Sequence, residues 1–145
     1  FLLSPLVGTD GKLFAVDIQD KFLNLIREKA KKNKVANIAL VKSTETDAKL
    51  KAESVDLILM VDVYHEFSHP FEMTEKLIEA LKPGGRLVFV EFKLEDPMVP
   101  IKLVHKMSER QVIKEMATFP ELEHAKTDST LPWQHIIVFE KKKAK

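Results

Sequence analysis

The sequence predicts an α/β fold with a mostly parallel sheet and an antiparallel hairpin near its C-terminal end. Short, nearly continuous apolar runs alternate with amphipathic segments across residues 12–92, a pattern typical of parallel strands covered by helices. The last two apolar runs, within residues 122–140, have no helix between them, which indicates a hairpin. The chain has 145 residues and is 45% hydrophobic, so we expect residues 1–145 to form a single domain around one core.

The composition excludes several classes of protein. The absence of cysteine excludes a disulfide scaffold, a thiolate zinc site and a cysteine nucleophile. The 23 basic and 22 acidic residues give a net charge of +1, which argues against a strongly electrostatic nucleic-acid binder. No apolar run approaches the roughly 20 residues needed to cross a bilayer. We therefore expect a cytoplasmic protein without nucleic-acid or membrane partners.

In the first part of the chain, two strands are expected around one helix. A glycine-flanked turn precedes an apolar run that predicts a strand at residues 12–18. Apolar residues at helical spacing predict a helix over residues 20–32, with Asp20 as its cap. A second apolar run predicts a strand at residues 35–41, and the polar segment 42–54 predicts a loop.

The second part of the chain repeats this alternation and then ends in the hairpin. Residues 55–61 form the strongest predicted strand, and Pro70 is expected to begin a helix, because its missing N–H costs nothing in the first turn. Gly84 and Gly85 are expected to end that helix in a turn that serves backbone geometry rather than phosphate binding. A strand at residues 86–92 and an irregular segment at 93–107 follow. The capping-box pair Ser108 and Gln111 predicts a helix over residues 108–116, and two closing strands are expected at 122–130 and 133–140.

Candidate functional residues follow the strands, because ligands of open α/β sheets bind outside the carboxyl ends of the strands. Asp17 ends the first strand, where a carboxylate can accept hydrogen bonds from the 2′ and 3′ hydroxyls of a ribose. The alternative role for Asp17 is a helix cap, for which Asp20 is better placed. After the second strand, Thr44 and Glu45 can face an adenine edge; the alternative is an ordinary solvated loop.

The segment after the third strand has several side chains that can act as acids, bases or hydrogen-bond acceptors. Asp62, His65 and Glu66 bring two carboxylates and an imidazole to a strand's carboxyl end. His65 is the candidate general base, since imidazole titrates near neutral pH, and Glu66 is the second choice. His65 to His69 also form an H-E-x-x-H pattern, but Pro70 directly after it is incompatible with the continuous helix that a zinc hydrolase requires. We therefore predict no metal site.

Taken in order, these pieces resemble a class I S-adenosylmethionine-dependent methyltransferase of the small-molecule type. The likeness covers essentially the whole chain. It is carried by residues 8–18 (GTDGKLFAVDI), 55–58 (VDLI) and 81–87 (LKPGGRL), by Ser108 and Glu109, and by the closing hairpin at residues 133–140. The resemblance implies a three-layer Rossmann-like methyltransferase fold and S-adenosylmethionine as cofactor.

The resemblance also implies roles for the candidate residues. Asp17 would hold the ribose hydroxyls, with Ile18 packed on the adenine. Thr44 and Glu45 would border the adenine ring, and Asp62 would lie beside the methionine part of the cofactor. The segment after the fourth strand would cover the substrate.

The chain also departs from the family's pattern. The family begins with a strand and a glycine-rich loop that cradles the cofactor, and it has seven strands where six are expected here. We therefore expect the first strand to be missing, the chain to be a piece of a longer protein or to be completed by a partner, and cofactor binding to be weak in the chain as given. An unpaired sheet edge would favour pairing with another chain, so a homo-oligomer is possible.

The leading hypothesis is methyl transfer to a small-molecule acceptor. The sulfonium already activates the methyl group, so the protein mainly aligns the reactants, and a base is needed only for an acceptor with an acidic proton. One alternative is an NAD-type dinucleotide oxidoreductase, because Asp17 suits either adenosine ribose; the closing hairpin argues against it. Another is a non-catalytic binding module that retains the fold. Residues 93–107 do not identify the acceptor.

Overall fold

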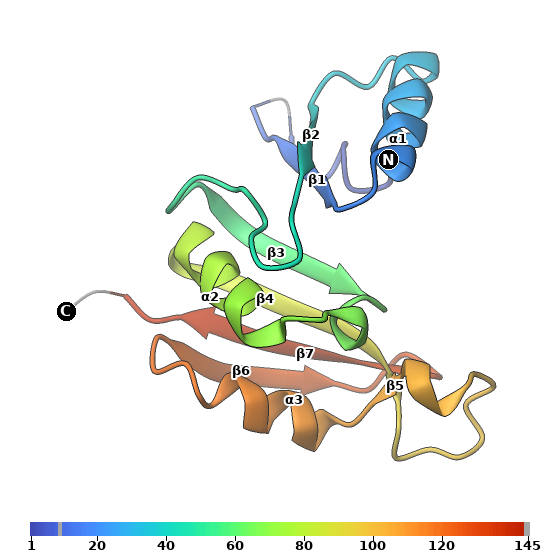
Figure 1. Cartoon of the computed structure of the whole chain (residues 1–145), viewed down its shortest axis with the longest axis vertical. Helices are drawn as coiled ribbons and strands as arrows, with labels where there is room; N and C mark the ends of the chain where they lie inside the picture. The colour runs from blue at the N-terminus through green and yellow to red at the C-terminus, as the bar shows by residue number, and fades with distance from the viewer. Residues whose placement is uncertain (9, 144–145) are drawn as a thin grey trace. The chain divides into compact units, whose positions relative to one another are not determined.

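The computed structural model describes residues 1–8 and 10–143, and its contacts divide the chain into two compact units, Phe1–Leu50 and Lys51–Lys145. The first unit is a strand–helix–strand motif (Figure 1). Its elements are β1 (Leu13–Asp17), α1 (Asp20–Lys32) and β2 (Ile38–Lys42). β1 and β2 are parallel, with Asp17 opposite Lys42, so both strands end at the same edge. α1 contacts both strands.

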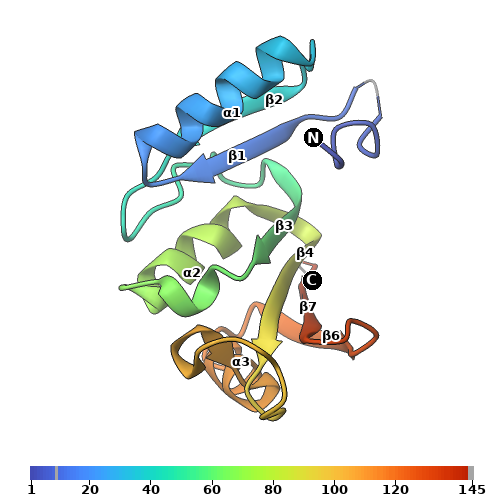
Figure 2. The same ribbon diagram turned by 90° about the vertical axis from the view of Figure 1, so that its right-hand side faces the viewer.

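The second unit is a five-stranded mixed sheet with two helices. Its elements are β3 (Val55–Val61), the 3₁₀ turn η1 (Tyr64–Glu66), α2 (Pro70–Ala80), β4 (Leu81–Lys93), the 3₁₀ turn η2 (Leu103–His105), β5 (Lys106–Met107), α3 (Glu109–Met116), β6 (Leu122–Asp128) and β7 (Gln134–Lys141). The strand order is β3-β4-β7-β6, and β5 also pairs with β4. Figure 2 shows α2 and α3 on the same face of this sheet.

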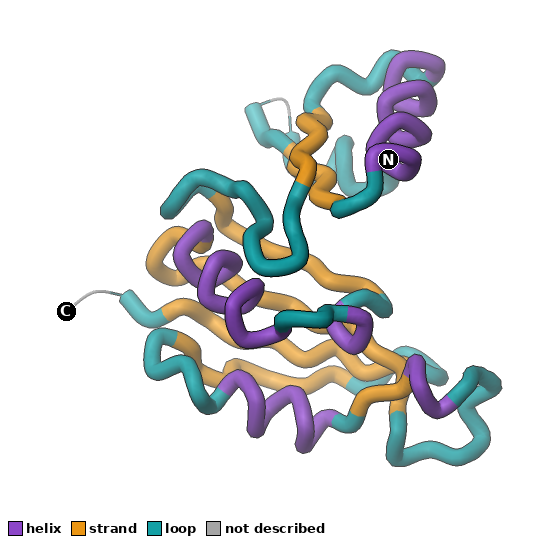
Figure 3. The backbone as a smooth tube through the Cα atoms, viewed as in Figure 1, coloured by secondary structure: helices purple, strands orange, loops and turns teal. Residues whose placement is uncertain are grey.

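The strand directions confirm the expected architecture. β3 and β5 run parallel to β4, whereas β7 runs antiparallel to both β4 and β6. The closing hairpin was therefore predicted correctly. Because β3 and β4 are parallel, both end at the edge where η1 and η2 lie (Figure 3). Residues that follow β3 and residues at the end of β4 are thus brought together.

Several element boundaries differ from the sequence-based expectation. β2 begins at Ile38 rather than residue 35, because Val35 donates its N–H to Ala30 at the end of α1 and Lys34 has a positive φ of 52°. β4 begins at Leu81, since a register shift opposite β3 accommodates the turn with Gly84 at φ 79°. β5 has only two residues, too few to show strand periodicity within the segment expected to be irregular.

The core of the second unit lies between the two helices and the central strands. α2 buries Met73, Leu77 and Ile78, and α3 buries Val112 and Met116. Phe89, Leu87 and Ile137 of the central strands are fully buried on the sheet. Removal of these apolar side chains from water is the main favourable contribution to the free energy of folding, at about 25 cal/mol per Å² of apolar surface buried. Within the described residues, no helix combines the length and apolar character needed to span a membrane.

α3 begins with one half of the expected capping box: Ser108 caps the helix, whereas the side chain of Gln111 donates to Oε1 of Glu115 at 2.9 Å. The hydroxyl of Ser108 accepts the N–H of Gln111 at 3.0 Å, and the backbone of Ser108 is extended. An amide N–H at a helix start has no partner within the helix, so the serine oxygen supplies one. Because Val112 and Met116 are buried by this helix, its start affects the packing of the whole unit.

We expect Ser108→Ala to lower the free energy of unfolding by about 1 kcal/mol, the usual cost of losing such a cap. Urea unfolding followed by circular dichroism measures the change. Ser108→Asp is the matched control, because its carboxylate also caps a helix and should keep near-native stability. Equal destabilisation by the two variants would show that the cap is not the cause.

Candidate active site

In the first unit, the sequence-predicted residues gather at one edge of the two-stranded sheet. The N–H of Ser43 donates to the carbonyl of Asp17 at 3.1 Å, which continues the strand pairing beyond Lys42. The segments 17–18 and 43–45 therefore leave the sheet side by side. Ile18 is 43% exposed, so its apolar side chain is available to a flat ligand.

The carboxylate of Asp17 has a local partner. Its Oδ1 accepts the N–H of Gln19 at 2.7 Å, and Gln19 is the residue that precedes α1. The expectation that Asp20 caps the helix was wrong: Asp20 is the first helical residue and pairs with Lys42 instead. A short turn closed by Asp17 directs the chain from the strand into the helix, and it fixes the carboxylate at the strand's end.

The loop after β2 is a compact turn rather than a loose connection. The N–H of Thr44 donates to the carbonyl of Asp47 at 2.9 Å, and the Thr44 hydroxyl contacts the same carbonyl at 3.4 Å. Thr44 and Glu45 are both exposed. These contacts hold Thr44 next to the carboxyl end of β2, with Glu45 beside it in the chain.

In the second unit, Asp62 holds a carboxylate oxygen without a partner. Its N–H donates to the carbonyl of Val90 at 2.8 Å, and its Oδ2 accepts the side-chain N–H of Gln134 at 2.8 Å. Its φ of 51° is a left-handed conformation that aspartate tolerates better than most residues. The other oxygen, Oδ1, is buried and has no hydrogen-bond partner among the described residues. A buried acceptor of this kind requires a donor from a ligand or water.

His65 is oriented by a buried carboxylate that the sequence analysis did not single out. Glu91 of β4 is fully buried, and its Oε2 lies 2.6 Å from Nδ1 of His65. Its Oε1 accepts the N–H of Tyr64 at 2.9 Å. The carboxylate acceptor next to Nδ1 favours the imidazole proton on that nitrogen, so that Nε2 is the acceptor nitrogen of the ring. Nε2 lies 3.3 Å from Nδ1 of His105.

Glu66 is placed differently from His65. Its side chain is 62% exposed, and Oε1 lies 4.0 Å from Nε2 of His65. An exposed carboxylate without a fixed hydrogen-bond partner is a weaker base than an oriented imidazole at neutral pH. The geometry therefore supports the predicted preference for His65 over Glu66.

Tyr64 anchors the turn that carries His65. Its ring is buried edge-on against Phe89 and Phe67, and its hydroxyl donates to Oε2 of Glu115 on α3 at 2.8 Å. Burial, reinforced by the bond to Glu115, raises the pKa of the Tyr64 hydroxyl well above its ordinary value of 10.0. The side chain thus links η1 to the core and to α3.

Three residues of the site were missed from the sequence: Glu91, His105 and Gln134. Glu91 gave a recognisable signal, since it is an acidic residue near the end of the apolar run 86–92. His105, within the segment expected to be irregular, is half-buried and faces His65. Gln134 gave no signal, because only the pairing of β7 with β4 carries it to Asp62.

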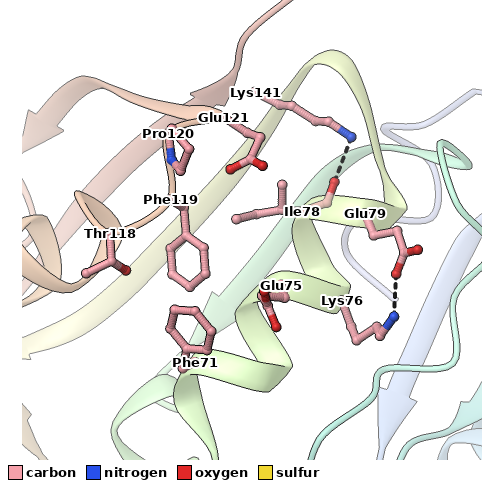
Figure 4. Close-up of a pocket in the computed structure, with 10 residues that line it drawn as sticks. All are labelled: Phe71, Glu75, Lys76, Ile78, Glu79, Thr118, Phe119, Pro120, Glu121 and Lys141. Carbon is pink, nitrogen blue, oxygen red and sulfur yellow. Dashed lines mark hydrogen bonds and ion pairs between the residues drawn. The ribbon is translucent and has the colours of Figure 1, made fainter.

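A groove in the second unit lies away from these residues. A groove of about 450 Å³ runs between α2 and the α3–β6 connection, with Phe71 stacked on Phe119 at 5.0 Å (Figure 4). Lys141 donates from its edge to the carbonyls of Ile78 and Leu81 at 2.8 and 2.7 Å. None of the sequence-predicted site residues lines it. We therefore assign the candidate site to the strand ends, where the uncompensated Asp62 oxygen and the oriented imidazole lie.

Because burial raises the pKa of the Tyr64 hydroxyl, we expect it to ionise at a higher pH in the folded protein than in the unfolded chain. Tyr64 is the only tyrosine of the sequence, so phenolate absorbance reports on it alone. The folded state keeps the phenolic proton after the unfolded chain has lost it, so this contribution to stability is complete below pH 10 and is lost as the pH rises above that value. We expect native protein to develop phenolate absorbance at higher pH than urea-unfolded protein. Coincident titrations would contradict the buried environment, and Tyr64→Phe provides the blank.

Sequence comparisons connect this chain with methyltransferases. A family profile described as "Methyltransferase domain" matches residues 1–143. The chain is 30% identical over 90 residues to the ubiquinone/menaquinone biosynthesis C-methyltransferase UbiE of Pseudomonas putida (strain GB-1), covering 61% of this chain and 35% of that protein. It is 26% identical over 101 residues to a demethylmenaquinone methyltransferase of Lactococcus lactis, covering 70% and 39%. The chain thus spans little more than a third of the length of these curated relatives.

The fold comparison agrees. The crystal structure of a SAM-dependent methyltransferase from Aquifex aeolicus superposes with a TM-score of 0.89 at 26% identity, covering 97% of this chain and 74% of that one. This confirms the expected α/β methyltransferase fold. Because the family profile extends over nearly all of the sequence, the chain belongs to the methyltransferase domain family, and its predicted likeness to class I S-adenosylmethionine-dependent methyltransferases is confirmed.

Proposed function

We propose that this protein transfers a methyl group from S-adenosylmethionine to a small-molecule acceptor. The observation that carries the proposal is the buried Oδ1 of Asp62, which has no donor among the described residues. The α-ammonium of the cofactor's methionine part is a donor of the right charge for this position. The family match and the similar Aquifex aeolicus structure support the same cofactor.

The first unit, taken by itself, holds groups suited to an adenosine moiety. Asp17 has a second carboxylate oxygen besides the one that accepts the N–H of Gln19, so it can accept from ribose hydroxyls. Ile18 offers an exposed apolar side chain to the adenine face, and Thr44 and Glu45 lie on the neighbouring turn. The sulfonium supplies an activated methyl group, so the protein's own contribution is mainly alignment.

His65 is proposed as the general base. Glu91 holds its ring through Nδ1, so the lone pair is on Nε2, which can take a proton from an acceptor hydroxyl once that hydroxyl replaces the contact with His105. If the acceptor is a hydroxylated ring, transfer of that proton to Nε2 would make the neighbouring ring carbon nucleophilic. The bond from this carbon to the methyl group would form as the methyl–sulfur bond breaks, the demethylated cofactor would leave as a neutral thioether, and the ring's own hydrogen would then be lost to solvent. The C-methyltransferase names of the curated relatives favour an acceptor of this kind.

Other expectations stay predictions. These are the single domain over residues 1–145, the missing first strand and glycine-rich loop, the weakened cofactor binding, the homo-oligomer and the cytoplasmic location.

One observation supports a further strand beside β3. β3 pairs with β4 alone among the described strands, and Leu57, Leu59 and Val61 on it are 39–52% exposed.

The cofactor proposal is tested by calorimetry with S-adenosylmethionine on the whole protein. We expect Asp62→Asn to weaken binding about 10- to 150-fold, the equivalent of a lost charge-assisted hydrogen bond of about 1.5–3 kcal/mol. Asparagine also tolerates the positive φ, so the fold should persist. Asp56→Asn is the matched control, since Asp56 is exposed and pairs with Lys82. Undiminished binding in Asp62→Asn would refute the proposed contact.

Asp17→Asn tests the ribose contact in the same assay. The amide oxygen retains an acceptor for Gln19, whereas the charge and the second acceptor are lost, so affinity should fall by about tenfold or more. Asp20→Asn, three residues along the chain, should bind normally. Tight binding of NADH in place of S-adenosylmethionine would instead support the oxidoreductase alternative.

His65→Gln separates binding from proton transfer. We expect the variant to bind S-adenosylmethionine with unchanged affinity and to lose methyl transfer to a hydroxylated acceptor about 10²- to 10⁴-fold, the usual contribution of a general base. A rate within a factor of about two of wild type would exclude His65 as the base.

A further inference from the structure

We propose that His65, His105 and Glu66 form a binding site for a divalent transition-metal ion, with Zn²⁺ as the best fit. Nε2 of His65, Nδ1 of His105 and a carboxylate oxygen of Glu66 all lie within 4.8 Å of one another. They come from two 3₁₀ turns, η1 and η2, that the ends of β3 and β4 bring together (Figure 3). The proposal does not depend on methyl transfer.

The spacing of the two imidazoles fits shared coordination. Two nitrogen ligands at 2.0–2.1 Å from a tetrahedral zinc ion are separated by about 3.3–3.4 Å. Nε2 of His65 and Nδ1 of His105 are 3.3 Å apart. The rings are inclined by 73°, so their two nitrogens can converge on a common point without ring stacking.

The protonation pattern of His65 suits a metal ligand. Its Nδ1 faces Oε2 of Glu91 at 2.6 Å, so the proton is on Nδ1 and the Nε2 lone pair is directed toward His105. A carboxylate behind a ligating histidine is a recurrent outer-shell arrangement, because it fixes the tautomer and raises ligand basicity. Glu91 is itself fixed by burial and by the N–H of Tyr64, so the orientation of His65 is set before any ion binds.

Glu66 completes the set from the solvent side. Its Oε1 is 4.0 Å from Nε2 of His65, and its exposed side chain has room to turn toward the ion. Two histidines and one glutamate leave a fourth tetrahedral position open, which is the pattern of catalytic rather than structural zinc sites. The donor set excludes Mg²⁺ and Ca²⁺ as preferred occupants, because those ions require oxygen ligands.

The H-E-x-x-H pattern explains why the site escapes sequence reasoning. In a zinc hydrolase both histidines lie on one helix, but here η1 ends at Glu66 and α2 begins at Pro70, with His69 as the residue before it. His105, 40 positions from His65, supplies the second imidazole instead. The first two residues of the pattern thus contribute to a cluster whose third member is distant in sequence.

Metal binding would have a functional consequence. The ion takes the same Nε2 lone pair that a general base uses, so an occupied site cannot accept a proton at His65. If His65 is the base proposed above, Zn²⁺ inhibits methyl transfer in proportion to occupancy.

The test is calorimetric titration of the whole protein with Zn²⁺ after treatment with a chelator, supported by Co²⁺ absorption spectra. We expect saturable binding of about one ion per chain, with the intense visible bands of tetrahedral Co²⁺ and no competition from excess Mg²⁺. His105→Ala should weaken binding at least about tenfold and abolish the visible bands, while His124→Ala, on the exposed part of β6, should leave both unchanged.

Glu66→Gln and Glu91→Gln provide independent variants if His105→Ala is poorly folded by circular dichroism. Each should weaken Zn²⁺ binding by roughly 10- to 100-fold, Glu66 as a ligand and Glu91 as the outer-shell carboxylate. Absence of saturable binding, or binding unaffected in all three variants, would overturn the site and leave the His65–His105 contact as an ordinary hydrogen bond. Either result is independent of cofactor binding or methyl transfer.

Discussion

The buried carboxylate of Glu91 is the constraint on which the candidate site depends. A fully buried carboxyl group is stable only when its oxygens have partners, and both oxygens are used here. One accepts the N–H of Tyr64 and the other faces Nδ1 of His65. Two consecutive residues of η1 are therefore tied to β4, so the imidazole has one orientation rather than many.

The contacts of two neighbouring residues, Tyr64 and Asp62, also fix the segment that carries His65. Tyr64 packs edge-on against Phe89 and reaches Glu115, which connects η1 to the core and to α3. Asp62 is fixed by Val90 and Gln134, one on each of the two central strands. The ends of β3 and β4 thus form a rigid rim. On this rim, Oδ1 of Asp62 has no hydrogen-bond partner among the described residues, and Nε2 of His65 faces Nδ1 of His105.

The same rim explains why the two proposed uses of His65, as a general base and as a metal ligand, would exclude one another. A ring held by a carboxylate through Nδ1 presents an unprotonated Nε2, and such a nitrogen accepts either a proton or a metal ion. His105 favours the metal ion over the proton, because its Nδ1, 3.3 Å from Nε2 of His65, adds a second nitrogen ligand that proton transfer does not require. Fold alone does not distinguish these chemistries, because function resides in the residues at the strand ends.

The sequence by itself determined the fold class, the order of the elements, the closing hairpin and the Ser108 cap, because these follow from local periodicity and turn chemistry. It also selected Asp17, Asp62 and His65 as candidates, since ligands of parallel sheets bind outside the carboxyl ends of the strands. Only the tertiary structure decided that Glu91 orients His65, that Gln134 reaches Asp62 and that His105 completes a cluster with Glu66. Those contacts join residues 26 to 72 positions apart, and strand pairing and helix packing, which no local pattern encodes, bring them together.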